Sequence, residues 1–329
     1  MKKLISSVSK ERFDKYDIHF APDWEIQYLD VPYSDETMIA ACKNADYLFV
    51  GSVHAVSEAV IAACPHLKMI HVEGVGYDKV DAAAAARHNI PVCNNRATNN
   101  GAVAEHTVGL ILAAMRRTAY CNEQIYDAGF AACQSEYRRE GERELAGKHV
   151  GLIGMGAIGR EVAKRLINWD CRVSYYDAFR PNTETEQALQ ISYLDLDELI
   201  ESCDIISLHV PVLPETIGLM NAARFRSMKK TAFLVNTARG EIIDQDALAQ
   251  ALENGEIAGA ALDILTPEPA PADHPLLNLS PEAKKRLTIT PHVAGTTDEA
   301  FLRMLKNAIE NFERVERGEK PNNIVNGLS

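Results

Sequence analysis

A strand, a glycine-rich turn and the start of a helix are indicated by VGLIGMGAIGR, residues 150–160. The first four residues form an apolar run that predicts a buried parallel strand, and the helical pattern EVAKRLINW follows the turn. In this context G-x-G-x-x-G is typical of dinucleotide binding, because its glycines allow a tight turn, close approach to a pyrophosphate and close helix–strand packing. Backbone N–H groups at the helix start would face the anion. The motif comprises Gly154, Met155, Gly156, Ala157, Ile158 and Gly159.

The next apolar run, Cys171 to Tyr176, ends in an acidic residue, Asp177. A carboxylate at this point can accept hydrogen bonds from an adenosine ribose diol and would repel a 2′-phosphate, which favours NAD over NADP. For the glycine motif alone, two alternatives stay open: S-adenosylmethionine binding, or a turn that binds nothing. The strand, helix and acid in register favour the dinucleotide.

Length and composition predict an ordinary globular protein of about two domains. The chain has 329 residues, of which 47% are hydrophobic and 24% charged, with a formal net charge of −12. This charge argues against nucleic acid or an anionic membrane as partner, and an anionic substrate would need a local positive group.

No signal peptide or membrane-spanning run is indicated. Seven scattered cysteines without a C-x-x-C pair indicate reduced thiols in a cytoplasmic protein, and we predict no metal site.

Residues 1–98 alternate between short apolar runs and helical patterns, which predicts a parallel α/β sheet. Two loops follow predicted strands, where ligands of such sheets usually bind. Gly74 and Gly76, in residues 73–78, would expose backbone N–H groups to a carboxylate. For the other loop, residues 51–54, an ordinary β–α turn is an equally good interpretation. The predicted strands are Leu4–Val8, Glu25–Leu29, Tyr47–Val50 and Lys68–Val72, and the predicted helices lie near Asp35–Lys43 and Ser57–Cys64.

A long helix, Asn99 to Arg117, is apolar nearly all round, which predicts burial on more than one side. We expect it to connect two domains and to be covered by a second subunit. Rossmann-type alternation then runs from Lys148 to about Pro291. A last amphipathic helix, Asp298 to Arg317, has Thr297 as its expected N-cap. The predicted strands are Val150–Ile153, Cys171–Tyr176, Asp204–Leu208, Ala232–Val235, Gly259–Leu262 and Leu287–Ile289.

Chemically useful side chains follow three of these strands: Arg239, Asp263 with Glu268, and His292. In a doubly wound sheet these loops share the cofactor edge. There an arginine can hold a carboxylate bidentately, an imidazole can exchange a proton with an alkoxide, and a carboxylate can fix the imidazole tautomer. Each residue alone could instead be structural, as a cap, a turn residue or a solvated loop charge. Together, beside a cofactor site, they favour carbonyl reduction.

The chain resembles the D-isomer-specific 2-hydroxyacid dehydrogenases over nearly its whole length. The motifs that carry the resemblance keep the family's order and spacing. They are residues 74–78, 102–107, 154–159, Asp177, 209–211 with 215–216, 236–240, 262–263 with 268–269, and 291–292.

The resemblance implies two Rossmann-like domains: a discontinuous, flavodoxin-like substrate domain, 1–99 with 296–329, and a doubly wound NAD-binding domain, 100–295. It implies that Arg239 binds the substrate, that His292 is the acid/base with Glu268 as its partner, and that Val75 and Gly76 hold the substrate carboxylate. It also implies a homodimer. The implied cofactor-binding residues are Gly154, Met155, Gly156, Ala157, Ile158, Gly159, Asp177, His209, Val210, Pro211, Thr216, Thr237, Ala238, Asp263 and His292.

Some positions depart from the family pattern. Ala97 precedes Thr98 where many relatives have a Gly-x-Asn turn, and Phe130 stands where a tryptophan is common. Residues 52–54 contain no arginine, which disfavours phosphoglycerate as substrate. Glu268 in place of glutamine argues against a formate dehydrogenase.

The expected activity is NAD-dependent, reversible reduction of a small 2-oxo acid to the D-2-hydroxy acid. The alternative is an NAD(H)-sensing interaction protein on the same scaffold, similar to the corepressor relatives of the family, since a fold does not determine a function. Which 2-oxo acid is reduced does not follow from the residues.

Overall fold

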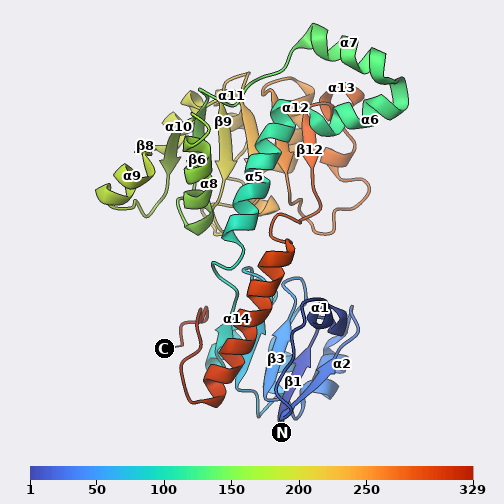
Figure 1. Cartoon of the computed structure of the whole chain (residues 1–329), viewed down its shortest axis with the longest axis vertical. Coiled ribbons are helices and arrows are strands. Elements are labelled where there is room, and N and C mark those ends of the chain that lie inside the picture. Colours follow the sequence, from blue (N-terminus) through green and yellow to red (C-terminus); the bar gives the residue numbers. More distant parts are fainter. Residues whose placement is uncertain (329) are drawn as a thin grey trace. The chain divides into compact units, whose positions relative to one another are not determined.

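Two compact units make up the computed structural model of the protein, which describes residues 1–328 (Figure 1). Unit 1 consists of Met1–Asn99 and the chain from Thr296 onward, and unit 2 of Asn100–Gly295. Each contains one parallel β-sheet. Within the described residues, no helix is both long and apolar enough to cross a membrane.

Unit 1 is built on a five-stranded parallel sheet in the order β2-β1-β3-β4-β5, which is the flavodoxin-like order predicted for it. Helices cover both faces, so neighbouring residues of one strand belong to opposite cores. Leu48 packs with α2, α3 and α4, whereas Tyr47 and Phe49 pack with α1 and α14. The elements are β1 (Lys2–Ser6), α1 (Lys10–Lys15), β2 (Trp24–Tyr28), α2 (Asp35–Cys42), β3 (Tyr47–Val50), α3 (Glu58–Ala62), β4 (Met69–Val72), α4 (Ala82–Arg87), β5 (Val92–Cys93) and α14 (Asp298–Glu316).

Unit 2 contains a seven-stranded parallel sheet in the order β12-β11-β10-β9-β6-β7-β8. Helices α5 and α8 pack on one face and α10, α11 and α12 on the other, as a doubly wound sheet requires. The strands are β6 (His149–Ile153), β7 (Arg172–Tyr176), β8 (Ser192–Tyr193), β9 (Ile205–Leu208), β10 (Phe233–Asn236), β11 (Gly259–Leu262) and β12 (Leu287–Ile289). The helices are α5 (Asn100–Met115), α6 (Thr118–Ala128), α7 (Phe130–Glu140), α8 (Ala157–Ile167), α9 (Thr183–Leu189), α10 (Leu196–Ser202), α11 (Ala222–Ser227), α12 (Gln245–Glu253) and α13 (Pro281–Lys284).

Strand β6 lies at the point where the strand order of unit 2 reverses, between β7 and β9. In open α/β sheets a ligand binds at such a point, outside the carboxyl ends of the strands. The glycine motif follows β6 directly, so the topology places it at the expected cofactor position.

The predicted elements are present, with a few shifted ends. The prediction that the first strand extends to Val8 is wrong, because β1 ends at Ser6. The Ser6 hydroxyl donates to the Val8 carbonyl oxygen and accepts from the Val8 N–H, which turns the chain out of the sheet. The long helix ends at Met115, two residues early, and Arg117 then adopts a left-handed backbone with φ 45°. Thr297 caps α14 as predicted, accepting from the Ala300 N–H.

Candidate active site

The residues predicted to bind cofactor follow β6, β7, β9, β10, β11 and β12 of unit 2. All strands of this sheet are parallel, so these loops share one edge. Each loop also touches the next one. This edge is the candidate active site.

The three glycines of the motif have different surroundings. Gly154 has φ 103°, and a Cβ there would lie 2.5 Å from the carbonyl oxygen of His209. A Cβ on Gly159 would lie 2.2 Å from the carbonyl oxygen of Gly154. Gly156, the N-cap of α8, faces open space, with nothing within 4 Å of an added Cβ. Two glycines therefore serve packing, and the third leaves the approach to the helix N-terminus open, which fits a bound pyrophosphate.

Asp177 lies beside the glycine turn. Its carboxylate accepts hydrogen bonds from the N–H of Met155, at 2.6 Å, and from the N–H of Phe179, at 2.8 Å. The acid predicted at the end of β7 is thus joined directly to the turn that follows β6. The Met155 side chain is buried in the core, so Met155 shapes this turn through its backbone.

The loop after β9 closes over the glycine turn. Burial lowers the pKa of His209 to about 4, and its Nε2 lies 2.9 Å from the Ser207 hydroxyl. His209 is therefore neutral near pH 7. Val210 adds a side-chain contact at the Cβ position of Gly154. The Thr216 hydroxyl donates to the Pro211 carbonyl oxygen at 2.6 Å and shapes the rest of the loop.

The turn after β10 carries Arg239. The Asn236 amide holds this turn, donating to the Arg239 carbonyl oxygen and accepting from the Ala238 N–H. The hydroxyls of Thr237 and Thr107 lie 2.9 Å apart and join the turn to α5. The Arg239 side chain donates to the Ala238 carbonyl oxygen, and no carboxylate pairs with it within residues 1–328. Arg239 is therefore a cation without an internal counter-ion, which suits it to bind an anion.

Asp263, after β11, is a buried carboxylate that accepts three hydrogen bonds and has an imidazole nearby. It accepts from the Thr290 hydroxyl at 2.5 Å and from the N–H groups of Val293 and Ala294 at 3.0 and 2.9 Å. The Nε2 of His106 lies 3.5 Å away. Burial acts to raise the pKa of Asp263, but the bonds from these groups outweigh it and the pKa is lowered. The ionised carboxylate thus clamps the loop that follows β12.

That loop presents His292 to Glu268. The Nδ1 atom of His292 lies 2.8 and 2.9 Å from the two carboxylate oxygens of Glu268. Because a carboxylate accepts, Nδ1 carries the proton and Nε2 is left for another partner. Nε2 has no hydrogen-bond partner in the described chain, and the side chains of His292 and Glu268 are 35% and 43% exposed. The pair has the form of an oriented acid/base.

The His292 backbone is strained. Its φ is 54°, in the left-handed region that favours glycine. Its N–H donates to the carbonyl oxygens of Asp263, at 2.6 Å, and Thr290, at 3.1 Å. Such a conformation persists only where surrounding contacts hold it, and it occurs often at functional sites. Asp263 supplies these contacts through both its backbone and its side chain.

In unit 1, the loop of residues 73–78 follows β4. Its carbonyl oxygens are occupied, since the Asn94 amide donates to Val75 and the Asn95 amide to Glu73, each at 2.6 Å. The N–H groups of Val75 and Gly76 donate to no partner among the described residues. Free N–H groups on a loop held by its carbonyls fit an anion. In the other loop, residues 51–54, the His54 imidazole lies 2.8 Å from the Ser7 hydroxyl. This contact supports the interpretation of residues 51–54 as an ordinary β–α turn.

Proteins similar to this chain are known. A model of the D-isomer-specific 2-hydroxyacid dehydrogenase NAD-binding domain matches residues 108–294. The chain belongs to the D-isomer-specific 2-hydroxyacid dehydrogenase family. It is 38% identical to a glyoxylate reductase of Thermofilum pendens over 94% of this chain and 87% of that protein. It is 36% identical to a D-3-phosphoglycerate dehydrogenase of Archaeoglobus fulgidus over 89% of this chain, but spans only 54% of that protein.

A solved member of the family has the same fold along the whole chain. The D-lactate dehydrogenase of Aquifex aeolicus, in complex with NAD and lactic acid, has a TM-score of 0.83 at 28% identity and full coverage of both chains. As a member of the 2-hydroxyacid dehydrogenases, this protein is an oxidoreductase with an NAD-binding domain, and NAD is its cofactor.

Several residues that shape this dehydrogenase site were not predicted as site residues. Asn236, in the motif of residues 236–240, holds the turn of Arg239, and Thr290, directly before the motif of residues 291–292, bonds to the carboxylate that holds the turn of His292. The Nε2 of His106 lies 3.0 Å from the Thr290 hydroxyl and 3.5 Å from the Asp263 carboxylate. The sequence offered a signal for His106, because this polar residue stands in an otherwise apolar run.

Proposed function

We propose that this protein reduces a small 2-oxo acid to the D-2-hydroxy acid, reversibly, with NADH. The observation that carries the proposal is the bond between the His292 imidazole and the Glu268 carboxylate, on the same sheet edge as Arg239, whose guanidinium pairs with no carboxylate among the described residues. An oriented proton donor and a carboxylate-binding cation are the two protein groups that this reduction needs. Bound NADH supplies the hydride.

Each of these residues has a separate task. Arg239 binds the substrate carboxylate and carbonyl oxygen through two parallel N–H bonds. His292 gives a proton from Nε2 to the carbonyl oxygen as negative charge develops there, and takes it back in the reverse direction. Glu268 keeps the Nδ1 proton in place and stabilises the imidazolium that precedes transfer. Catalysis thus begins with a protonated His292 and ends with a neutral one.

The cofactor is proposed to bind along the whole edge. The glycine turn and the N-terminus of α8, Gly154–Gly159, would hold the pyrophosphate. Asp177 would accept from the adenosine ribose, which disfavours NADPH. The loops after β9, β10 and β11 would line the nicotinamide end through His209, Val210, Pro211, Thr216, Thr237, Ala238 and Asp263.

The proposed substrate is a small 2-oxo acid without a phosphate. Val75 and Gly76, whose N–H groups are free among the described residues, are proposed to donate to its carboxylate. The absence of arginine from residues 52–54 disfavours phosphoglycerate, and the similarity to a glyoxylate reductase supports a small acid. Glyoxylate, hydroxypyruvate and pyruvate are the first candidates.

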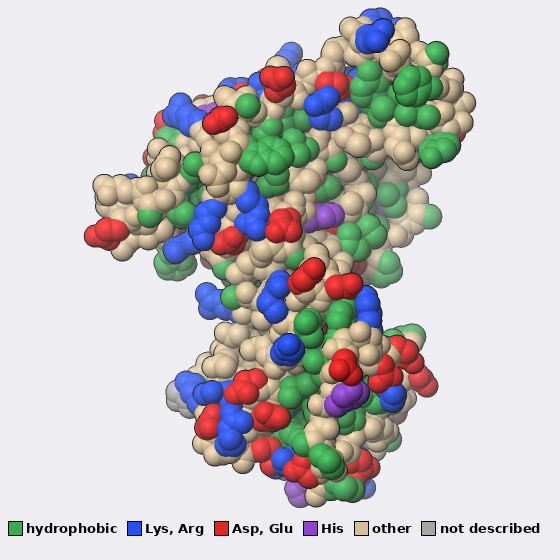
Figure 2. All heavy atoms as spheres, viewed as in Figure 1, with side chains coloured by type: hydrophobic (Ala, Val, Ile, Leu, Met, Phe, Trp, Pro, Cys, Tyr) green, Lys and Arg blue, Asp and Glu red, His purple; other side chains and the backbone are tan. Residues whose placement is uncertain are grey.

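A homodimer is proposed as the working form, as expected for the family. Helices α6 and α7 of unit 2 carry exposed apolar side chains, with Tyr126 at 83% and Phe130 at 67% exposure. Hydrophobic side chains gather over this region of the surface (Figure 2). Contiguous exposed apolar surface is typical of an interface.

The seven cysteines are free thiols, which supports the proposed cytoplasmic location.

An isotope experiment tests the proposal. NADH carrying deuterium at the transferable C4 position is mixed with the protein and one 2-oxo acid at a time. The proposal predicts deuterium at C2 of a product with the D configuration. An L product, or NADH oxidation without a deuterated hydroxy acid, would contradict it.

A further inference from the structure

Glu268 lies on an exposed part of its loop, and its carboxylate bonds to the Nδ1 atom of His292. The prolines on either side of Glu268 offer the loop no N–H donors. The loop is held instead at Thr266, two residues earlier. The Thr266 N–H donates to the Gln245 side-chain oxygen at 3.2 Å, and the Thr266 carbonyl oxygen accepts from the Gln245 side-chain nitrogen at 3.0 Å.

A buried histidine adds a third bond at the same place. The Nδ1 atom of His274 accepts from the Leu276 N–H at 3.2 Å, so the imidazole proton is on Nε2. Nε2 lies 3.1 Å from the Thr266 carbonyl oxygen and therefore donates to it. His274 is 4% exposed and Gln245 9%, so water competes little for these bonds.

The turn of Arg239 also packs against Thr266. A Cβ on Gly240 would lie 2.7 Å from the Thr266 nitrogen and 2.7 Å from the Leu265 carbonyl carbon. Gln245, the first residue of α12, belongs to the same stretch of chain. The segment that follows Arg239 thus supports the loop of Glu268 twice, through a close backbone contact and through the Gln245 amide.

We propose that Gln245 and His274 are positioning residues for Glu268. By fixing the Thr266 backbone, they keep the Glu268 carboxylate at Nδ1 of His292. This inference rests on the proposed function, in which His292 is the acid/base and Glu268 its partner. The attraction between a carboxylate and an imidazolium weakens with distance, so a loop freed from this anchor stabilises protonated His292 less.

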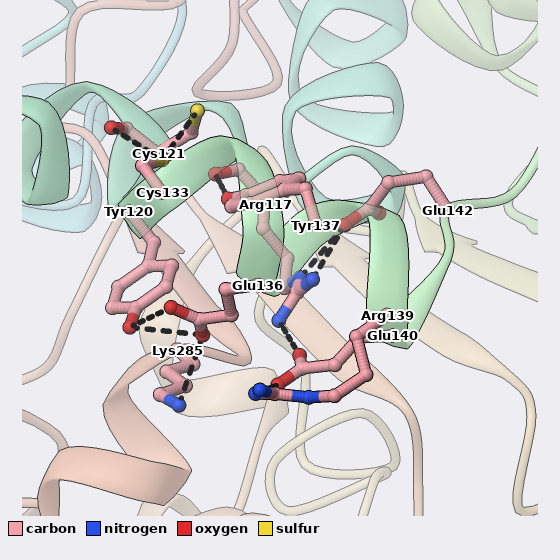
Figure 3. A network of polar contacts seen from close by, with 10 residues as sticks. All are labelled: Arg117, Tyr120, Cys121, Cys133, Glu136, Tyr137, Arg139, Glu140, Glu142 and Lys285. Atoms are coloured by element: carbon pink, nitrogen blue, oxygen red, sulfur yellow. Dashed lines mark hydrogen bonds and ion pairs between the residues drawn. The ribbon is translucent and has the colours of Figure 1, made fainter. Parts of the chain in front are cut away.

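Another polar network of unit 2 provides a control. At the base of the hairpin formed by α6 and α7, Lys285 pairs with Glu136, and Arg117 pairs with Glu140 and Glu142 (Figure 3). Lys285 precedes β12, so its network lies at the amino-terminal edge of the parallel sheet, opposite the candidate active site. Lys285→Gln therefore perturbs unit 2 without touching the loop of Glu268.

The experiment measures kcat/KM for reduction of a 2-oxo acid as a function of pH. Reduction consumes protonated His292, so kcat/KM falls on the alkaline side. Gln245→Met and His274→Phe remove bonds to Thr266 but keep similar side-chain volumes. Each should move this fall to lower pH by about one pH unit and reduce kcat several-fold, with NADH affinity near the wild-type value. Lys285→Gln should lose thermal stability and keep the wild-type pH profile.

Glu268→Gln separates this inference from the proposed function. It should move the alkaline fall in the same direction, and Gln245→Met added to it should cause little further shift, because both changes act through one contact. If Glu268→Gln keeps the wild-type profile, the acid/base assignment fails and the inference falls with it. If Glu268→Gln moves the fall but Gln245→Met and His274→Phe do not, the positioning inference fails alone.

Two further results would overturn the inference. An equal shift in Lys285→Gln would make the shift a general consequence of lost stability. Full additivity of Gln245→Met and Glu268→Gln would show that Gln245 acts independently of Glu268. Thermal unfolding checks that each variant is folded, and Gln245→Asn, whose shorter amide pairs less well with Thr266, serves if Gln245→Met is not.

Discussion

The backbone N–H of His292 donates to the carbonyl oxygen of Asp263 across 2.6 Å, while the Asp263 carboxylate accepts from the two N–H groups that follow His292. Asp263 thus holds the proposed proton donor in its left-handed conformation. It is a positioning residue for His292, whatever it also contributes to cofactor binding.

Asp263→Asn should lower both turnover and stability. The amide lacks the charge and presents a donor to groups that are themselves donors, so the free energy of unfolding should fall by about 2–3 kcal/mol. Thr290→Val removes only one donor and should cost about 1 kcal/mol. Chemical denaturation and NADH oxidation measure the two effects. Wild-type stability and turnover in Asp263→Asn would show that the Asp263 carboxylate does not hold the loop of His292 in place.

His292→Asn should reduce NADH-linked turnover by about 10²–10⁴-fold, the usual contribution of a general acid/base. NADH affinity, measured by fluorescence, should stay near the wild-type value. Glu268→Gln keeps an acceptor for the Nδ1 proton but not the charge. Its turnover should fall less than that of His292→Asn. If His292→Asn kept near-normal rates, another group would be the proton donor.

The glycine motif offers a matched pair of variants. Gly159→Ala should disturb folding, because the new Cβ would lie 2.2 Å from a carbonyl oxygen. Gly156→Ala adds a methyl group to open space and has φ −72°, so it should fold normally but bind NADH at least tenfold more weakly. Thermal unfolding and NADH titration separate the two. Unchanged NADH affinity in Gly156→Ala would place the pyrophosphate elsewhere.

Asp177→Asn should weaken discrimination against NADPH. The asparagine keeps one acceptor for the Met155 N–H but loses the charge that would repel a 2′-phosphate. The ratio of kcat/KM for NADH over NADPH should fall about tenfold, since a charge pair near the surface contributes about 1–4 kcal/mol. An unchanged ratio would remove Asp177 as the cofactor selector.

His71 should make the stability of unit 1 pH-dependent. It is fully buried between Phe49 and Phe312, and burial lowers its pKa to about 4. Between the usual value of about 6.5 and about 4, the unfolded chain binds a proton that the folded chain does not. Stability therefore falls as pH drops through this range, by up to about 3 kcal/mol.

Urea unfolding between about pH 7 and about pH 5 tests this, with His71→Gln as control. Glutamine does not titrate and can still accept from Asn311, which bonds to His71 Nε2. The stability loss on acidification should be smaller in the variant. Equal losses would show that His71 does not titrate in this window.

Much of the fold could be predicted because β/α alternation and the glycine motif are local patterns. Strands Tyr47–Val50 and Gly259–Leu262 have the bounds that their apolar runs indicate. The hairpin of α6 and α7 was not predicted, because its helices bury only Cys133 and so lack an apolar stripe. The turn at Ala97, with φ 71°, retains a glycine-like backbone where the family's glycine is replaced.

The site was predictable as a set of loops but not as a set of contacts. The strand ends indicated which residues share the edge with Arg239 and His292. That Asp263 is buried under the His292 turn, with Thr290 and His106 around it, depends on packing between distant segments. No spacing along the chain encodes such contacts.

The most direct test of the account is NADH oxidation by the wild-type protein with a panel of 2-oxo acids: glyoxylate, hydroxypyruvate, pyruvate and bulkier acids, with NADPH in parallel. The account predicts rapid turnover of at least one small acid with NADH and little with NADPH. NADH binding without turnover of any acid would contradict it, and would favour an NAD(H)-sensing protein on the same scaffold.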